Sequence, residues 1–369
     1  MYNKLTSSRL IWGGESGCPE RIVGFDYLKV LMSYAVVTCH YWESNQEIAY
    51  HVVFDSIRGC CIATFVMLSF FLTGNAIENG GFEVLFKRIV RLFKPYLVWP
   101  IIAIIFYDSL SYIKDRMFTF TFRDLGYQIL FGSTRIEGVM YYNWDLMVII
   151  LFLWTVFHYF GKHTGWVIVI GLMLADIGWI ISEGNYNSFV NMPWEMKWTL
   201  GRLFEFYPYA VVGMVLKKLL EKITSTVMQE EKYRNFFRYI FLIMIFELAW
   251  MLTYYHDVDS AFAWKGFGDG HTMQMLTSTA FITVSYFIPY SSGRISSIIH
   301  RIIGMVSRYT MGIYCLHNIV GTICVYIALR MYPAIVNSLL MCFIIFLLSY
   351  IMSFVIAKLP FRFVKQIVC

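Results

Sequence analysis

The stretch FDYLKVLMSYAVVTCHYW, residues 25–42, is apolar enough to cross a bilayer, yet it carries Asp26, Lys29 and His40. Lys29 and His40 are eleven residues apart, which in a helix is three turns and roughly 16 Å of rise. Eleven steps of about 100° leave the two side chains within about 20° of each other around the helix axis. A charge in hydrocarbon costs at least ~2.5 kcal/mol, so such residues usually line a polar cavity or pair with another group. The stretch therefore predicts a membrane helix that forms the wall of a site.

The composition of the whole chain indicates a polytopic membrane protein. Of 369 residues, 58% are hydrophobic and only 15% are charged, whereas soluble domains average about 25% charged residues. The mean hydropathy is +0.59. The net charge of +6 comes from basic residues clustered between apolar runs, as in cytoplasmic loops of membrane proteins, so we expect no nucleic-acid partner. None of the eight cysteines shows metal-ligand spacing, and we expect no metal.

Apolar runs predict an all-α protein with about ten transmembrane helices and no soluble domain. The predicted spans lie at about 22–42, 52–77, 92–112, 143–160, 165–182, 203–219, 236–255, 272–290, 304–329 and 334–357. Every other loop is basic, which predicts that both termini are cytoplasmic. Residues 1–21 are then a cytoplasmic tail, 22–358 one membrane domain and 359–369 a second cytoplasmic tail.

Several motifs occur in a fixed order along the chain. Lys29-x10-His40, preceded by Asp26, lies in the first span, and FFLTG occupies residues 70–74. Arg88-x-x-Arg91 opens the third span, and SRYTMGIYCLHN occupies residues 307–318. Together they resemble the acyltransferase-3 family of integral membrane O-acyltransferases, in a stand-alone form without a fused extracytoplasmic domain. Two departures are that Lys29 replaces the commoner arginine and that a glutamate expected after Asn143-Trp144 is missing.

The resemblance implies transfer of an acyl group, usually acetyl from acetyl-CoA, to a hydroxyl of a cell-surface polysaccharide or lipid-linked sugar. It also implies a multi-pass protein of the bacterial inner membrane, in contact with membrane lipids. His40 is the expected general base, because an imidazole titrates near pH 6.5 and can remove the hydroxyl proton. The residues expected to bind donor or acceptor are Lys29, Asp26, Arg88, Arg91, His317 and Arg202. The oligomeric state is not predicted.

Asp26 lies too far along the helix to orient His40 and is expected to pair with Lys29 or with Arg88 and Arg91. The other residues each have a purely structural alternative. His40 fits an interfacial histidine, and Lys29 can extend to the headgroups. Arg88 and Arg91, with Lys87 and Lys94, also fit a positive-inside cluster. His317 fits a histidine packed between helices, and Arg202 fits an ion pair with Glu205, three residues further on.

Three questions of mechanism stay open at this point. The protein could carry an acyl group across the membrane for a separate transferase, or it could be a secondary transporter. The sequence shows no internal repeat of the kind common in such transporters. Direct transfer and a covalent acyl-enzyme also both remain open.

Overall fold

The computed structural model describes residues 22–42, 48–117, 121–132, 140–183, 194–226, 267–288, 293–360 and 366–368. Within these ranges the chain forms helices and no strand, which confirms the all-α prediction. The α-helices are α1 (Val23–Tyr41), α2 (Ile48–Asn79), α3 (Phe82–Asp115), α4 (Phe122–Phe131), α5 (Tyr141–Glu183), α6 (Trp194–Thr226), α8 (Phe267–Phe287), α9 (Arg294–Ser307), α10 (Thr310–Met331) and α11 (Leu339–Lys358), with a 3-10 turn, η2, at Pro333–Ile335. Residues 1–21 and the predicted span at 236–255 lie outside the described part.

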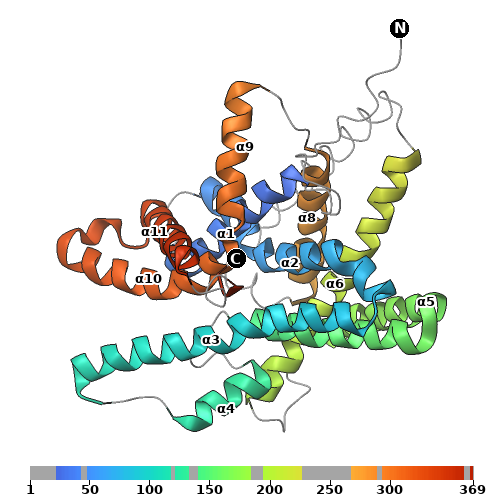
Figure 1. The fold of residues 1–369 in the computed structure, drawn as a ribbon, viewed down its shortest axis with the longest axis horizontal. Coiled ribbons are helices and arrows are strands. Elements are labelled where there is room, and N and C mark those ends of the chain that lie inside the picture. Colours follow the sequence, from blue (N-terminus) through green and yellow to red (C-terminus); the bar gives the residue numbers. More distant parts are fainter. Residues whose placement is uncertain are drawn as a thin grey trace.

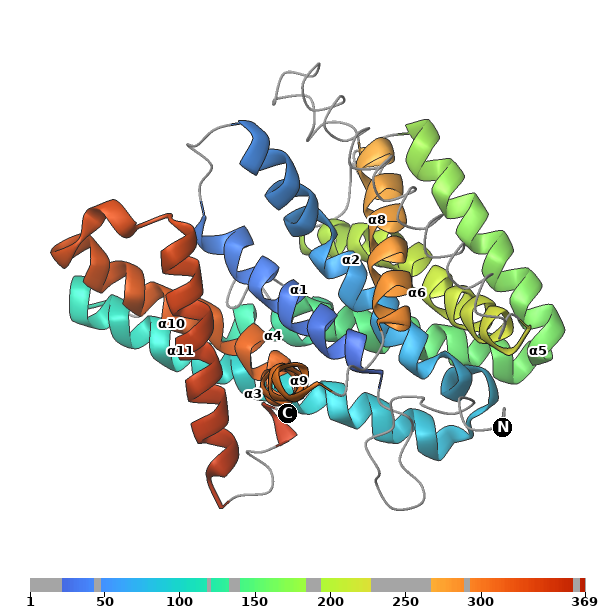
Figure 2. The ribbon, with the colours of Figure 1, turned by 90° about the horizontal axis from the view of Figure 1, so that it is seen from above.

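Helix α1 is the element around which the described bundle is arranged. It packs against α2, α8, α9, α10 and α11, and Figure 2 shows it running between them. Phe25, Leu28, Met32 and Val36 are all buried, and their spacing of three or four residues places them on one face of the helix. The helix that the sequence predicts at 22–42 therefore forms within one residue at each end.

Five helices in the described ranges are long and apolar enough to cross a membrane. They are Ile57–Asn79 within α2, Phe82–Asp115, Tyr141–Gly178 within α5, Thr310–Met331 and Leu339–Lys358. The protein is thus a multi-pass membrane protein. The total of ten spans and the cytoplasmic position of the termini stay predictions.

Helix α5 contains the break predicted between the fourth and fifth spans. Gly161 has φ 72° and ψ 172°, which are not helical backbone angles, so α5 consists of two helical arms joined at this residue. Glycine adopts such a conformation without steric cost. Figure 2 shows two arms of α5 that run in different directions. The short GKHTG segment therefore acts as a turn, as the sequence predicts.

Glycines bring several helices into backbone contact. A Cβ at Gly213 of α6 would overlap the Met67 carbonyl of α2, and one at Gly24 of α1 would overlap the Ser285 carbonyl of α8. Small residues at such crossings are typical of helix pairs in membranes, where close van der Waals packing replaces the hydrophobic driving force.

A buried carboxylate ties α2, α5 and α6 together at one end. Glu78 lies 2.6 Å from Lys218 Nζ and 3.3 Å from Lys162 Nζ, and it accepts a hydrogen bond from Trp166 Nε1 at 3.0 Å. The alternation of basic loops assigns all three segments to the cytoplasmic side, so these contacts agree with the predicted topology.

The last described residues pack against the bundle. Ile367 and Val368 are buried. The Trp99 indole of α3 donates to the Ile367 carbonyl at 3.0 Å, and the Gly312 N–H of α10 points to the Val368 carbonyl at 3.2 Å. Residues 366–368 of the predicted 359–369 tail are thus joined to α3 and α10.

Candidate functional site

His40 and His317 lie side by side, although the sequence separates them widely. His40 is exposed in the last turn of α1, and His317 is fully buried in α10. Their ring centroids are 5.1 Å apart. The next residue on α1, Tyr41, donates a hydrogen bond to the Asn318 carbonyl at 3.0 Å, and its ring lies where a Cβ at Gly321 would be. The first and last sequence motifs therefore meet at one site.

The hydrogen bond of His317 defines which ring nitrogen carries its proton. Nδ1 lies 2.7 Å from the Tyr314 carbonyl oxygen, and because a carbonyl only accepts, Nδ1 is the donor. Nε2 of the neutral ring then carries a lone pair. This atom is buried, and no group in the described part of the chain forms a hydrogen bond with it. A hydrogen-bond acceptor is therefore available beside His40.

A row of polar side chains leads from this pair into the bundle. The Tyr314 ring centroid is 6.1 Å from that of His317, and the Tyr142 centroid is 5.7 Å from that of Tyr314. Tyr142 of α5 interacts electrostatically with Arg88 of α3. This polar row ends at Arg88 and thus contains side chains from four helices, α1, α10, α5 and α3.

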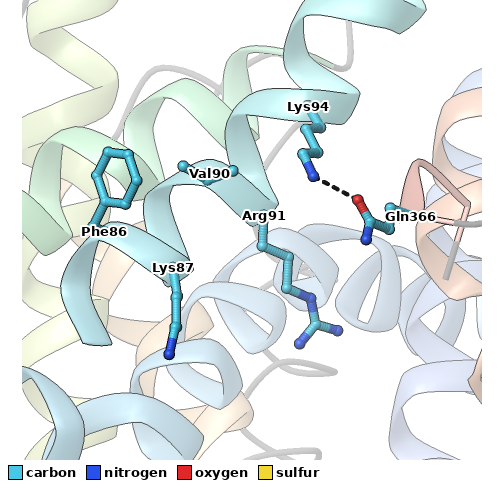
Figure 3. Close-up of a pocket in the computed structure, with 6 residues that line it drawn as sticks. All are labelled: Phe86, Lys87, Val90, Arg91, Lys94 and Gln366. Carbon is cyan, nitrogen blue, oxygen red and sulfur yellow. Dashed lines mark hydrogen bonds between the residues drawn. The ribbon is translucent and has the colours of Figure 1, made fainter. Parts of the chain in front are cut away.

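The two arginines of the Arg-x-x-Arg motif point to different surroundings. Arg88 is partly buried and donates from Nη2 to Ser69 Oγ of α2 at 2.8 Å. Arg91 is exposed and lines a surface pocket of about 360 Å³, together with Phe86, Lys87, Val90, Lys94 and Gln366 (Figure 3). Lys94 Nζ donates to Gln366 Oε1 at 2.5 Å. Of the two arginines of the motif, Arg88 therefore lies at the end of the polar row. Arg91 lies in the surface pocket, which we call the cationic pocket.

Asp26 and Lys29 lie in the half of α1 far from His40. Asp26 is buried and accepts a hydrogen bond at 2.6 Å from the Oγ of Ser307, the last residue of α9. Lys29 is partly buried, and its carbonyl accepts a hydrogen bond from Ser33 Oγ at 2.8 Å. The structure therefore does not bring either residue to the imidazole pair.

Arg202 of α6 is held by a carboxylate that the sequence reasoning passed over. Its Nε lies 2.8 Å from Asp145 Oδ2 of α5, and both side chains are buried. Its guanidinium also lies over the Tyr141 ring, 4.7 Å from the centroid. Asp145 directly follows Asn143-Trp144. A carboxylate therefore lies close to the position at which the resemblance predicts a glutamate. The sequence feature that could have identified Asp145 is its charge at the start of the predicted span at 143–160.

Arg58 is a second residue that the sequence reasoning missed. It lies in α2, interacts electrostatically with His40, and stacks over the Trp42 ring at 5.2 Å. As an arginine inside the predicted 52–77 span, it carried the same signal that singled out Lys29 and His40. The site at this end of α1 thus holds a cation near His40.

Comparisons with known proteins agree with the motifs and the helical fold. A family model described as an acyltransferase domain, Acyl_transf_3, matches residues 22–358. Searches of curated proteins and of solved structures gave no match. The match covers nearly the whole chain and includes the His40–His317 pair, the polar row and every residue of the cationic pocket except Gln366. The chain belongs to the acyltransferase-3 family.

Proposed function

We propose that this membrane protein transfers an acetyl group from acetyl-CoA to a hydroxyl of a cell-surface polysaccharide or lipid-linked sugar, in the bacterial inner membrane. The observation that carries the proposal is the pair of His40 and His317, whose rings are 5.1 Å apart. The His40 ring is exposed, so an incoming sugar hydroxyl could reach it. Nε2 of His317 is buried, can accept a hydrogen bond, and has no hydrogen-bond partner among the described residues.

In the proposed reaction His40 acts as general base. An imidazole nitrogen removes the proton from the sugar hydroxyl while the hydroxyl oxygen attacks the thioester carbonyl carbon. The C–S bond then breaks, an ester forms, and the CoA sulfur leaves with the proton returned by the imidazolium. No covalent enzyme intermediate is needed, and no oxidant or metal enters the balance.

His317 is proposed to orient His40. Because its Nδ1–H is committed to the Tyr314 carbonyl, its Nε2 can accept a hydrogen bond from the N–H of His40. This bond would hold the His40 lone pair toward the acceptor hydroxyl. Arg58, which interacts with His40, would supply positive charge where the thioester oxygen becomes an oxyanion.

The donor is proposed to enter at the cationic pocket. Lys87, Arg91 and Lys94 line this pocket, and cations there would bind the phosphates of acetyl-CoA. The row from Arg88 through Tyr142 and Tyr314 would accommodate the polar pantetheine arm. Lys29 and Asp26 are also proposed to contribute to donor binding, and Arg202, held by its ion pair with Asp145, is proposed to shape the acceptor side.

The decisive experiment uses purified protein in vesicles, with labelled acetyl-CoA supplied to one face and label followed into added glycan or lipid-linked sugar. His40→Gln should reduce incorporation by at least about 100-fold, the usual contribution of a general base. His158→Gln is the matched control, because His158 is an exposed histidine stacked on Trp154, 4.6 Å between ring centroids, outside the site.

The outcomes separate the alternatives. Transfer by the purified parent protein with no second protein present excludes a carrier that needs a partner. Equal incorporation by the parent and His40→Gln would contradict the proposed base. Movement of a solute that does not depend on acetyl-CoA would instead indicate a transporter.

A further inference from the structure

Helix α9 turns its polar side toward the protein. His300 Nδ1 lies 2.8 Å from the Tyr27 hydroxyl of α1, and Ser307 donates to Asp26 at 2.6 Å. His300 Nε2 also bonds to Ser296 at 2.8 Å, on the same side of the helix. The groups that hold α9 in place are thus hydrogen-bonding groups.

Its outward side is apolar. Ile295, Ile298, Ile299, Ile302 and Met305 are between 42% and 76% exposed. They recur at spacings of three and four residues, which form a continuous stripe on a helix. A surface helix in water has the opposite arrangement, with its apolar stripe against the core. The exposed face of α9 therefore matches an apolar medium better than water.

Three arginines border this stripe. Arg294, Arg301 and Arg308 are seven residues apart and all exposed, and successive positions at this spacing drift by only about 20° around the helix. None forms an ion pair with a carboxylate in the described ranges. A line of arginines along the edge of an apolar face is complementary to a membrane surface, where anionic headgroups border the hydrocarbon of the acyl chains.

The length and direction of α9 fit the surface of a membrane. Its 14 residues reach about 21 Å, which is less than the ~30 Å hydrocarbon core. Figure 1 shows α9 standing crosswise to the spans α3 and α5, and Figure 2 views it nearly end-on while α3 still runs across the view. A helix perpendicular to α3 and α5 would lie in the plane of the bilayer.

We propose that α9 lies in the membrane interface, with its isoleucine stripe in the acyl region, and that Arg294, Arg301 and Arg308 bind the phosphates of anionic phospholipids. Because its polar side holds Asp26 and Tyr27, this lipid contact is joined directly to the start of the helix that carries His40.

The test places the photoreactive amino acid p-benzoylphenylalanine at Ile298 of the full-length protein, in vesicles of equal moles of phosphatidylglycerol and phosphatidylcholine. Mass spectrometry identifies the cross-linked product. We expect a lipid adduct in which phosphatidylglycerol exceeds phosphatidylcholine about fivefold or more, given the attraction of each surface arginine for anionic lipid. R294Q/R301Q/R308Q should bring this ratio close to one.

Two controls keep the result interpretable. K114Q/R116Q/R330Q removes the same charge from exposed positions outside α9 and should leave the ratio unchanged. The same photoreactive residue at Phe343, 52% exposed on α11, should give lipid adducts in every variant and so reports correct folding. A protein adduct at Ile298, from a second copy or another partner, would overturn the proposal. So would the absence of any adduct, or a ratio of one before the arginines are changed.

Discussion

At the scale of single residues, the orientation of one imidazole decides what the site can do. The Tyr314 carbonyl accepts from His317 Nδ1 at 2.7 Å and so leaves Nε2 as a buried acceptor next to His40. Position 317 should therefore tolerate a residue with an acceptor at the Nε2 position better than an apolar residue of similar size.

The first prediction compares two replacements of His317. His317→Leu should lower kcat at least about tenfold and leave the KM for acetyl-CoA unchanged, because orientation of His40 acts on the chemical step. His317→Gln, whose amide lies near the Nε2 position, should recover part of that loss. Steady-state kinetics of both variants checks the prediction. An equal loss in both variants, accompanied by equally lower thermal stability, would reduce His317 to a packing residue.

The second prediction concerns Arg91 in the cationic pocket. Arg91→Gln should raise the KM for acetyl-CoA roughly tenfold or more, since a hydrogen bond to a charged group contributes about 1.5–3 kcal/mol. The same substitution should have no effect with acetyl-pantetheine, which lacks the phosphates. Lys114→Gln, at another exposed cation of α3, is the control. A rise in KM that is as large with acetyl-pantetheine would show that Arg91 does not bind phosphate.

At the scale of helices, backbone contacts decide which positions accept a side chain. Gly213 faces the Met67 carbonyl, whereas an added Cβ at Gly171 of α5 would meet nothing within 4 Å. Gly213 and Gly171 thus differ in the space available for a Cβ, and this difference depends on helix packing that the sequence does not reveal.

The third prediction follows from this difference. Gly213→Ala should lower the midpoint of thermal unfolding by several degrees, because α6 has to move away from α2. Gly171→Ala should leave the midpoint unchanged or raise it, because alanine favours helix over glycine. Thermal denaturation of the purified variants in detergent measures both. A fall of equal size for Gly171→Ala would mean that the contact at Gly213 is not the cause.

The sequence predicted the long apolar helices well and the short amphipathic ones poorly. Helix α1 and the break at Gly161 appear where expected, because apolar runs and glycine act locally. The sequence predicts loops where α4 and most of α9 form, because short helices of mixed polarity contain no long apolar run. The motif residues were found, but the contact between His40 and His317 was not, since it depends on the crossing of two distant helices. Arg58 and Asp145 were missed although each is a charged residue within a predicted span, the same signal that singled out Lys29 and His40.

At the scale of the whole molecule, topology decides which substrates meet. Glu78, Lys162 and Lys218 come together at one end, and the basic loops assign that end to the cytoplasm. His40 lies at the opposite end of α1 from the predicted cytoplasmic tail. The donor and the acceptor would then approach from opposite sides.

The fourth prediction tests this topology with single cysteines introduced into a variant in which all eight native cysteines are replaced by serine. A maleimide that cannot cross membranes should label Lys162→Cys and Lys87→Cys only after the cells are permeabilised. It should label Arg330→Cys, at the end of α10, in intact cells. Labelling of position 162 from outside would invert the predicted orientation, and labelling of positions 162 and 330 from one side would change the number of spans between them.

The bond between Trp99 and Ile367 also has a consequence for biosynthesis. The two residues are 268 positions apart in the chain. At 5–20 residues per second, the ribosome needs roughly 15–50 s to make the intervening segment. During that interval α3 is already available for insertion, but its indole N–H lacks the native acceptor and the Gln366 wall of the cationic pocket does not yet exist. The cationic pocket is therefore completed late in synthesis, long after the helix that supplies its cations.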